Sequence, residues 1–381
     1  MPCTSLMEMW GAIEHLKDPN LVACVQRYFG VQPVPKSSYE NSSNGSSPND
    51  PNNSVFTQSE TKKYNITNRW WYIIFLVSTH LGDELFYALF FSFMFWNVDA
   101  VVARSILLIW CISLSSGQAM KDYIKWPRPP YPPVYCLQKK WAQEYGMPST
   151  HAVIGVTIPF SLLYFSLQRY QCNVSYGIFL ALLFCGMVCL SRLYLGMHSV
   201  LDIVAGLILG AFFLLMFLPL PELLDQFLLT NPWSPVTLLL VSSLCVALYP
   251  SSIYSLTRQD TAVVLGATAG LYIGLWTFHH LNPVLPLPSN SLPVSTLKNV
   301  GLAVERTVIG CSAIFIFRTC FKSAYRFILS LVSGPKMSAP LFLVLSFYYV
   351  LYFMVGFHIT FLIPHLFRYL GIERSSYLKE I

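Results

Sequence analysis

Apolar runs of about 20 residues recur along the chain from Trp70 onward, the length that one helix needs to cross the hydrocarbon core of a bilayer. Because backbone polar groups in lipid must be satisfied within the segment, each run is predicted to be a helix. The last run is long, and we expect it to bend near Pro364 or to break into a span and an interfacial piece. The nine predicted spans cover residues 71–96, 101–119, 151–168, 175–193, 199–219, 233–253, 261–281, 299–320 and 339–367.

The chain before the first run has a different pattern. Residues 4–30 show loose helical periodicity, which predicts a short helix at the membrane surface. Residues 36–60 are rich in Ser, Asn and Pro and predict a disordered linker. We therefore expect an extramembrane segment over residues 1–68, a transmembrane domain over 69–370 and a tail over 371–381. Residues 1–35 lack the continuous apolar core of a signal peptide, so the first span is expected to target the chain.

Composition narrows the class of protein further. Of the 381 residues 54% are apolar and only 11% are charged, against roughly 25% charged residues in a soluble domain. This balance excludes a soluble enzyme, a disordered chain and a nucleic-acid-binding protein, and it predicts an all-α polytopic membrane protein. The ten cysteines are scattered without a C-x-x-C pair, so neither a disulfide framework nor a zinc site is expected.

Three short polar stretches interrupt the apolar pattern at the ends of predicted spans. They are residues 121–129 after the second span, 148–151 at the start of the third, and 191–202 across the link between the fourth and fifth. Exactly two spans separate the last stretch from the first two, so all three face the same side of the membrane. We therefore expect their side chains to form one site.

The residue types in these stretches suit a phosphate ester. Arg offers a bidentate fork and Lys a compact point charge to a phosphate dianion. Such cations also stabilise the negative charge on the phosphoryl oxygens in the transition state. Backbone and hydroxyl donors at the positive end of the third span would add to them. The predicted phosphate-binding residues are Lys121, Arg128, Ser149, Thr150 and Arg192.

Two histidines and a carboxylate complete the predicted chemistry. His198 is the candidate nucleophile, and Asp202, four residues later on the same helical face, would fix its tautomer. His151 would protonate the departing alcohol. Each residue taken singly also has a structural interpretation, since Lys and Arg at span ends reach the interface and His often caps a helix. An Asp one turn inside a span is harder to explain without a function.

The three stretches together resemble the signature of the type 2 phosphatidic acid phosphatase superfamily. The pattern here is Lys121-x6-Arg128-Pro, then Pro-Ser-Thr150-His151, then Ser-Arg-x5-His198-x3-Asp. The family usually has Gly where this chain has Thr150, and Gly would allow closer backbone approach to phosphate. The resemblance implies a helical membrane fold and a metal-independent, cofactor-free reaction through a phosphohistidine on His198.

The sequence around the motifs resembles a narrower family. KWPRPPYPPV, EYGMPSTHA, CLSRLYLGMHSVLD and TRQDTAVVLGATAG are similar to the sphingosine-1-phosphate phosphatases of the endoplasmic reticulum, over residues of about 65–370. This similarity implies a sphingoid base phosphate as substrate, with the lipid bilayer as its setting and no nucleic-acid partner. Other members of the superfamily, a lipid transferase with the same residues and a non-catalytic membrane protein stay open as alternatives.

The remaining charged residues leave two questions open. Asp83 and Glu84 in the first span either contact the substrate amine or form a polar span end, whereas Glu305 and Arg306 are expected to be structural. The Lys and Arg distribution favours a cytosolic site. The family resemblance and the N-x-S/T sequons near the N-terminus favour a lumenal one, which is our expectation. The sequons are at Asn41, Asn44, Asn52, Asn65 and Asn173.

Overall fold

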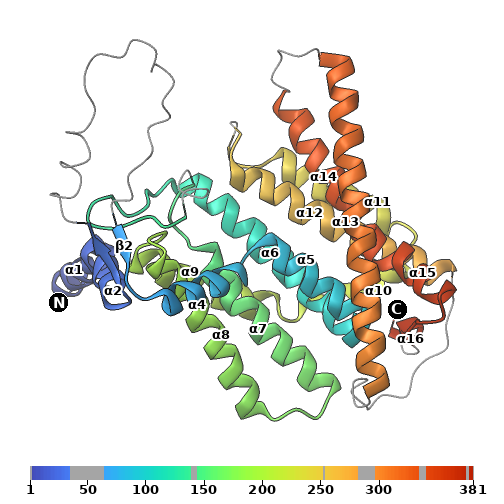
Figure 1. Cartoon of the computed structure of the whole chain (residues 1–381), viewed down its shortest axis with the longest axis horizontal. Helices are drawn as coiled ribbons and strands as arrows, with labels where there is room; N and C mark the ends of the chain where they lie inside the picture. The colour runs from blue at the N-terminus through green and yellow to red at the C-terminus, as the bar shows by residue number, and fades with distance from the viewer. Residues whose placement is uncertain are drawn as a thin grey trace.

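The computed structural model describes residues 2–34, 64–138, 144–251, 254–281, 297–333, 340–374 and 377–380. These residues form an elongated assembly of helices with one short two-stranded sheet (Figure 1). The elements that follow this sheet in the chain are all helical. They are α4 (Arg69–His80), α5 (Glu84–Phe93), η1 (Met94–Val98), α6 (Ala100–Ile124), α7 (Thr150–Arg169), α8 (Val174–Tyr194), α9 (Val200–Phe217), α10 (Leu220–Thr230), α11 (Ser234–Ala247), α12 (Leu256–Leu281), α13 (Leu297–Ser333), α14 (Leu341–Phe357), η3 (His358–Leu362), α15 (Ile363–Tyr369) and α16 (Tyr377–Glu380).

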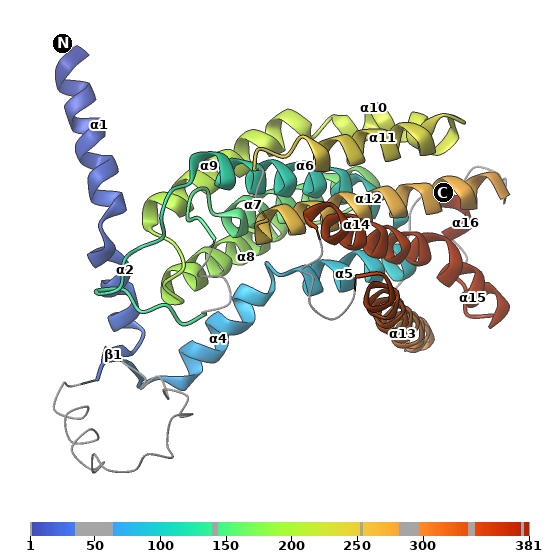
Figure 2. The ribbon, with the colours of Figure 1, turned by 90° about the horizontal axis from the view of Figure 1, so that it is seen from above.

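The N-terminal segment forms two helices rather than the one predicted over residues 4–30. Asp18 caps the second helix, and Pro19 begins it, so α1 (Pro2–Lys17) ends before α2 (Pro19–Tyr28). Helix α1 projects away from the bundle (Figure 2). Strand β1 (Val31–Pro33) then pairs antiparallel with β2 (Tyr64–Ile66). The predicted linker over residues 36–60 and the sequons at 41, 44 and 52 lie outside the described residues.

The prediction of an all-helical polytopic membrane protein is confirmed, but the count of nine spans is not matched. Within the described ranges, seven helices are long and apolar enough to cross a membrane, or eight if the bent pair α4 and α5–η1 is one span. The predicted span 233–253 is helical only over α11, whose 14 residues fall short of the usual length. The last predicted span runs through a π-helical turn and Pro364, where a bend was expected.

The first predicted span is broken near its middle. Helices α4 and α5 meet at an angle of 64°, and the break covers Leu81, Gly82 and Asp83. The Asp83 carboxylate lies 2.6 Å from His80 Nδ1, across the break. The break therefore brings polar side chains into the middle of an apolar segment.

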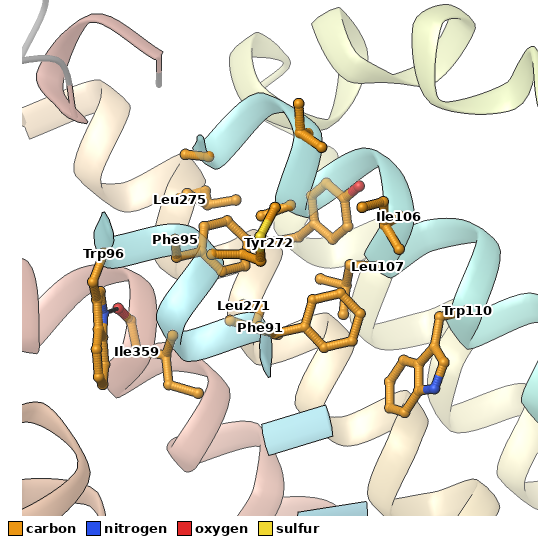
Figure 3. Packing of buried hydrophobic residues seen from close by; sticks show 14 of the residues in the cluster. Phe91, Phe95, Trp96, Ile106, Leu107, Trp110, Leu271, Tyr272, Leu275 and Ile359 are labelled. Atoms are coloured by element: carbon orange, nitrogen blue, oxygen red, sulfur yellow. Dashed lines mark hydrogen bonds between the residues drawn. The ribbon is translucent and has the colours of Figure 1, made fainter. Parts of the chain in front are cut away.

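The main hydrophobic core lies where α5 and η1 pack against α6, α12 and η3. Phe91, Phe95 and Trp96 meet Leu271 and other buried residues of that core (Figure 3). The indole Nε1 of Trp96 donates a hydrogen bond of 2.9 Å to the carbonyl of Ile359, whose helix is π-helical at that point. This contact joins two segments that are far apart in the sequence.

Helices α12 and α14 approach each other closely because glycines line their contact. A Cβ atom at Gly266 or Gly270 would overlap the backbone carbonyls of Tyr349 and Phe353, and one at Gly356 would overlap the backbone of α12. Only a residue without a side chain fits at these positions. We call this contact the glycine seam.

The C-terminal tail folds back onto the start of α6. The Glu380 carboxylate pairs with Arg374 and accepts a hydrogen bond of 2.7 Å from the backbone N–H of Ala100. Arg374 also donates to the carbonyl of Val98, 2.7 Å away. These contacts hold the end of the chain against the side of the bundle opposite the site described below.

Candidate active site

The three polar stretches meet at one end of four neighbouring helices, α6, α7, α8 and α9. These helices pack against one another in chain order, α6 on α7 and α7 on both α8 and α9. The direction of the chain places the end of α6, the start of α7, the end of α8 and the start of α9 together (Figure 1). All eight predicted site residues lie at these ends or in the adjoining loops.

His198 lies in the turn between α8 and α9 and is fully buried. Its Nδ1 faces Asp202, 3.7 Å from Oδ2, and its Nε2 lies 3.4 Å from Nη1 of Arg128. The first distance is longer than a hydrogen bond, which is common before substrate binds. The ring therefore presents Nδ1 to a carboxylate and Nε2 to the cationic part of the site.

A capping box fixes the carboxylate of Asp202. Ser199 is the N-cap of α9, and its hydroxyl accepts a hydrogen bond from the Asp202 N–H while Asp202 Oδ2 accepts one of 2.8 Å from the Ser199 N–H. The other oxygen of Asp202, Oδ1, has no hydrogen-bond partner. Local helix geometry thus holds Oδ2, the oxygen that faces His198 Nδ1, in place beside the imidazole.

The environment of His198 favours its neutral form. Burial lowers the pKa of the imidazole well below 6.5, and the positive charges of Arg128, Arg192 and Lys121 lower it further. A neutral imidazole has a lone pair on one ring nitrogen, which a nucleophile requires. The neutral ring of His198 therefore keeps the lone pair that the predicted role requires.

A carboxylate that the sequence motifs do not indicate lies among the predicted phosphate ligands. Glu144 Oε2 is 3.1 Å from the Lys121 ammonium and 3.6 Å from the Arg128 guanidinium. Burial alone would raise the pKa of Glu144, but these two cations outweigh burial and hold that pKa below its usual value. Its second oxygen, Oε1, is buried without a partner. An ionised Glu144 thus balances part of the positive charge of the site.

Arg192, at the end of α8, connects the site to the first span. Its Nη1 donates hydrogen bonds to Thr79 of α4 at 2.6 Å and to Gln138 at 3.3 Å. Its Nε is buried and has no partner. A buried guanidinium with an unpaired N–H is suited to an anion that the structure does not contain.

The start of α7 lies directly against the start of α9. The Ser149 N–H donates to the Asp202 carbonyl at 3.1 Å, and a Cβ on Gly206 would lie 2.6 Å from the Ser149 carbonyl oxygen. The Ser149 hydroxyl is fully buried and has no hydrogen-bond partner. Thr150 is also buried and lines the cavity described below.

His151 lies opposite, where α7 meets the break of the first span. Its Nε2 is 3.6 Å from Asp83 Oδ1, a distance too long for a hydrogen bond, and that nitrogen has no partner. A Cβ on Gly82 would overlap the His151 ring. Glycine at the break therefore makes the room in which His151 sits.

A cavity of about 230 Å³ opens onto the cationic residues. Lys121, His151 and Arg192 lie at its polar end, whereas His198 and Asp202 do not line it. Carboxylates line the cavity too, and apolar side chains from α5, α6, α7 and α12 complete much of its wall: Leu85, Tyr87, Trp110, Leu114, Ile154, Val263 and Val264. The lining thus combines charged groups of both signs with an apolar surface.

Within the described ranges, no three His, Cys, Asp or Glu side chains are grouped so that they could hold a metal ion. The structure brings together all eight predicted residues. The sequence reasoning missed Glu144, although it belongs to the EYGMPSTHA stretch, and it left the role of Asp83 open. Both contribute carboxylates that face the predicted cations or histidines.

This set of helices and helix ends defines a membrane-embedded phosphatase. Residues 102–224 match the PAP2 superfamily, and that range contains all eight predicted site residues. Sphingosine-1-phosphate phosphatase 1 of Mus musculus is 36% identical over 333 residues, which cover 83% of this chain and 76% of that protein. Sphingosine-1-phosphate phosphatase 2 of Homo sapiens is 33% identical over 395 residues, which cover 94% of this chain and 99% of that protein.

The chain therefore belongs to the sphingosine-1-phosphate phosphatases of the PAP2 superfamily. These proteins are multi-pass membrane enzymes that hydrolyse phosphoric monoesters. A plant relative, lipid phosphate phosphatase delta of Arabidopsis thaliana, is 30% identical over 65% of this chain and 62% of that protein. No solved structure matches the chain.

Proposed function

We propose that the protein hydrolyses sphingosine 1-phosphate and related sphingoid base phosphates to the free base and phosphate, with His198 as nucleophile. The names and coverage of the relatives support the substrate class. The position of His198 between Asp202 and Arg128 carries the assignment of the mechanism. The mixed polar and apolar cavity supports a lipid whose tail stays in an apolar environment.

In the first step, His198 Nε2 attacks phosphorus and the bond between phosphorus and the alcohol oxygen breaks. Asp202 stabilises the positive charge that develops on the imidazole. His151 donates a proton to the departing oxygen, which otherwise would leave as an alkoxide. Lys121, Arg128 and Arg192, with the donors at Ser149 and Thr150, hold the charge on the phosphoryl oxygens.

In the second step, water attacks the phosphohistidine. His151, now neutral, accepts a proton from that water, the bond between phosphorus and nitrogen breaks, and phosphate leaves. The same histidine thus acts as acid and then as base. The site needs no further co-reactant.

The first experiment follows phosphate release by purified protein in detergent with EDTA. The substrates are sphingosine 1-phosphate, phosphatidic acid and glucose 6-phosphate, and the variants are wild type and His198→Ala. We expect release from the sphingoid substrate only, abolished by the substitution. Release from all three would keep the superfamily and remove the substrate assignment. Full activity in His198→Ala would disprove the mechanism, and transfer of phosphate to a lipid alcohol instead of water would identify a transferase.

We further propose an endoplasmic reticulum location with the site on the lumenal side, the location that the family resemblance implies. Asn65 is exposed on β2, near the site, whereas the exposed Asn173 caps the opposite end of α8. Glycosidase treatment after Asn65→Gln and Asn173→Gln tests this arrangement. Modification confined to Asn173 would place the site in the cytosol.

A further inference from the structure

The cavity is lined by carboxylates as well as by cations. Asp83, Glu84 and Asp260 line it together with Lys121 and Arg192. Glu144 also lines it, but that carboxylate is paired with two cations. A phosphate dianion in this cavity would meet carboxylates as well as cations. A substrate that carries its own positive charge beside the phosphate complements both.

Asp83 is a cavity carboxylate that lies beside the proposed proton donor. It lies 3.6 Å from His151 Nε2, the group that faces the leaving oxygen in the proposed mechanism. Its other oxygen contacts His80 at 2.6 Å, which holds the side chain across the break of the first span. About a quarter of the Asp83 side chain is exposed, so it remains accessible from the cavity.

The covalent structure of a sphingoid base phosphate fits this position. Its ammonium group is bonded to the carbon next to the one that bears the leaving oxygen. When His151 contacts that oxygen, the ammonium lies within reach of a carboxylate in contact with the same imidazole. An unpaired buried donor, Arg192 Nε, lies on the cavity wall and provides for the phosphate end of the same molecule.

We propose that the Asp83 carboxylate binds the ammonium group of the substrate while His151 holds the leaving oxygen. The break in the first span then selects amino-alcohol phosphates over phosphate esters that have no cation. This inference rests on the proposed function and adds the group that recognises the sphingoid base.

The alternative is that Asp83 only orients His151. In that case its loss would slow every substrate to the same degree, whatever the charge on the nitrogen. An ammonium contact predicts a loss that is confined to substrates with a charged nitrogen. The two roles are therefore distinguished by a pair of substrates.

The test compares sphingosine 1-phosphate with N-acetylsphingosine 1-phosphate, whose nitrogen is a neutral amide on the same carbon skeleton. For Asp83→Asn we expect kcat/KM for the amine to fall about 10- to 100-fold, the range for a hydrogen bond to a charged group. For the amide we expect a fall of less than about threefold. Equal losses for both substrates would overturn the proposal.

Two further variants sharpen the result. Asp83→Glu keeps the charge and is expected to restore part of the preference for the amine. Glu84→Gln removes the neighbouring charge from the same cavity and is expected to change both substrates together. A loss of preference in Glu84→Gln equal to that in Asp83→Asn would show a general potential instead of a contact, and would overturn the assignment to Asp83.

The wild-type protein separates this inference from the proposed function. Hydrolysis of neither substrate would refute the function itself. Equal hydrolysis of amine and amide would leave the phosphatase assignment intact and refute the ammonium site. Strong preference for the amine in the wild type, lost in Asp83→Asn, would support both.

Discussion

The carboxylate of Glu144 lies 3.1 Å from the ammonium of Lys121. A phosphoryl oxygen would have to take a similar position to be bound by the same lysine. The site is therefore not an open pocket of cations, since an internal anion already pairs with Lys121 and Arg128. In the proposed mechanism, the substrate phosphate competes with this carboxylate for Lys121 and Arg128.

Replacement of Glu144 by Gln is expected to tighten phosphate binding. The neutral amide keeps the shape of the side chain but no longer neutralises Lys121, so the inhibition constant for inorganic phosphate should fall about tenfold. Competitive inhibition of lipid hydrolysis measures this constant. The matched control is Glu222→Gln, which removes a carboxylate that contacts Gln168 at the opposite end of the bundle. Unchanged or weaker phosphate inhibition in Glu144→Gln would contradict the competition.

The proposed role of His151 as a proton donor predicts a dependence on the leaving group. Loss of the acid in His151→Ala should lower kcat by about 100- to 10,000-fold for an alcohol ester, the range for general acid catalysis. An alkyl-substituted nitrophenyl phosphate has a leaving group that needs no proton. The release of nitrophenol from it by His151→Ala should therefore fall far less than the release of the alcohol. Rapid-mixing measurement of both leaving groups checks this. Equal loss for the two esters would assign His151 to another role.

Gly82→Ala is expected to impair catalysis with little effect on folding. The new methyl group would overlap the His151 ring, so the ring has to shift while the backbone around it stays in place. A displacement of about 1 Å in a catalytic group typically costs on the order of 100-fold in rate. The control is Gly186→Ala on α8, where a Cβ would meet nothing within 4 Å. Similar rates for the two variants, with equal melting temperatures, would exclude a contact between residue 82 and His151.

The lowered pKa of His198 predicts how stability depends on pH. The unfolded chain takes up a proton on this histidine near pH 6.5, whereas the folded protein does so only at a pH well below that value. Between those two values the unfolded state binds more protons, so stability decreases as the pH falls below 6.5. His198→Asn removes this contribution.

The melting temperature in detergent between pH 7 and pH 5 tests the prediction. The wild-type value should fall more steeply than that of His198→Asn as the solution is acidified. Parallel curves for the two proteins would mean that His198 has the same proton affinity in the folded and unfolded states. The measurement is independent of any assay of activity.

The helical segments were readable from the sequence because each long apolar run can satisfy its backbone only as a helix. The convergence of Lys121, His151 and Asp202 was also predictable, since helix direction alone decides which ends share a side of the membrane. The break at Gly82 and Asp83 was not predictable, because the number of apolar residues over 71–96 is the same for a straight and for a bent segment. The 14-residue α11 was read as a full span for the same reason.

The contacts made by loops were beyond the sequence. Glu144 lies in a loop, and its pairing with Lys121 depends on how that loop folds back over the end of α6. The Arg192 contact with Thr79 joins residues 113 positions apart. Neither contact follows a helical or strand period, so no spacing rule could have indicated them.

The glycine seam has a consequence for the choice of lipid tail. Val263 and Val264 of the cavity wall belong to α12, which the seam holds at backbone distance from α14. The seam leaves α12 no room to move towards α14, because added volume at Gly266 or Gly270 would meet main-chain atoms. Leu85 and Tyr87 lie on the other side, on the helix that follows the break in the first span. The wall on α5 has no such backbone constraint from the seam, so substitutions that alter the preference for tail length are to be sought at Leu85 and Tyr87 and not at the seam glycines.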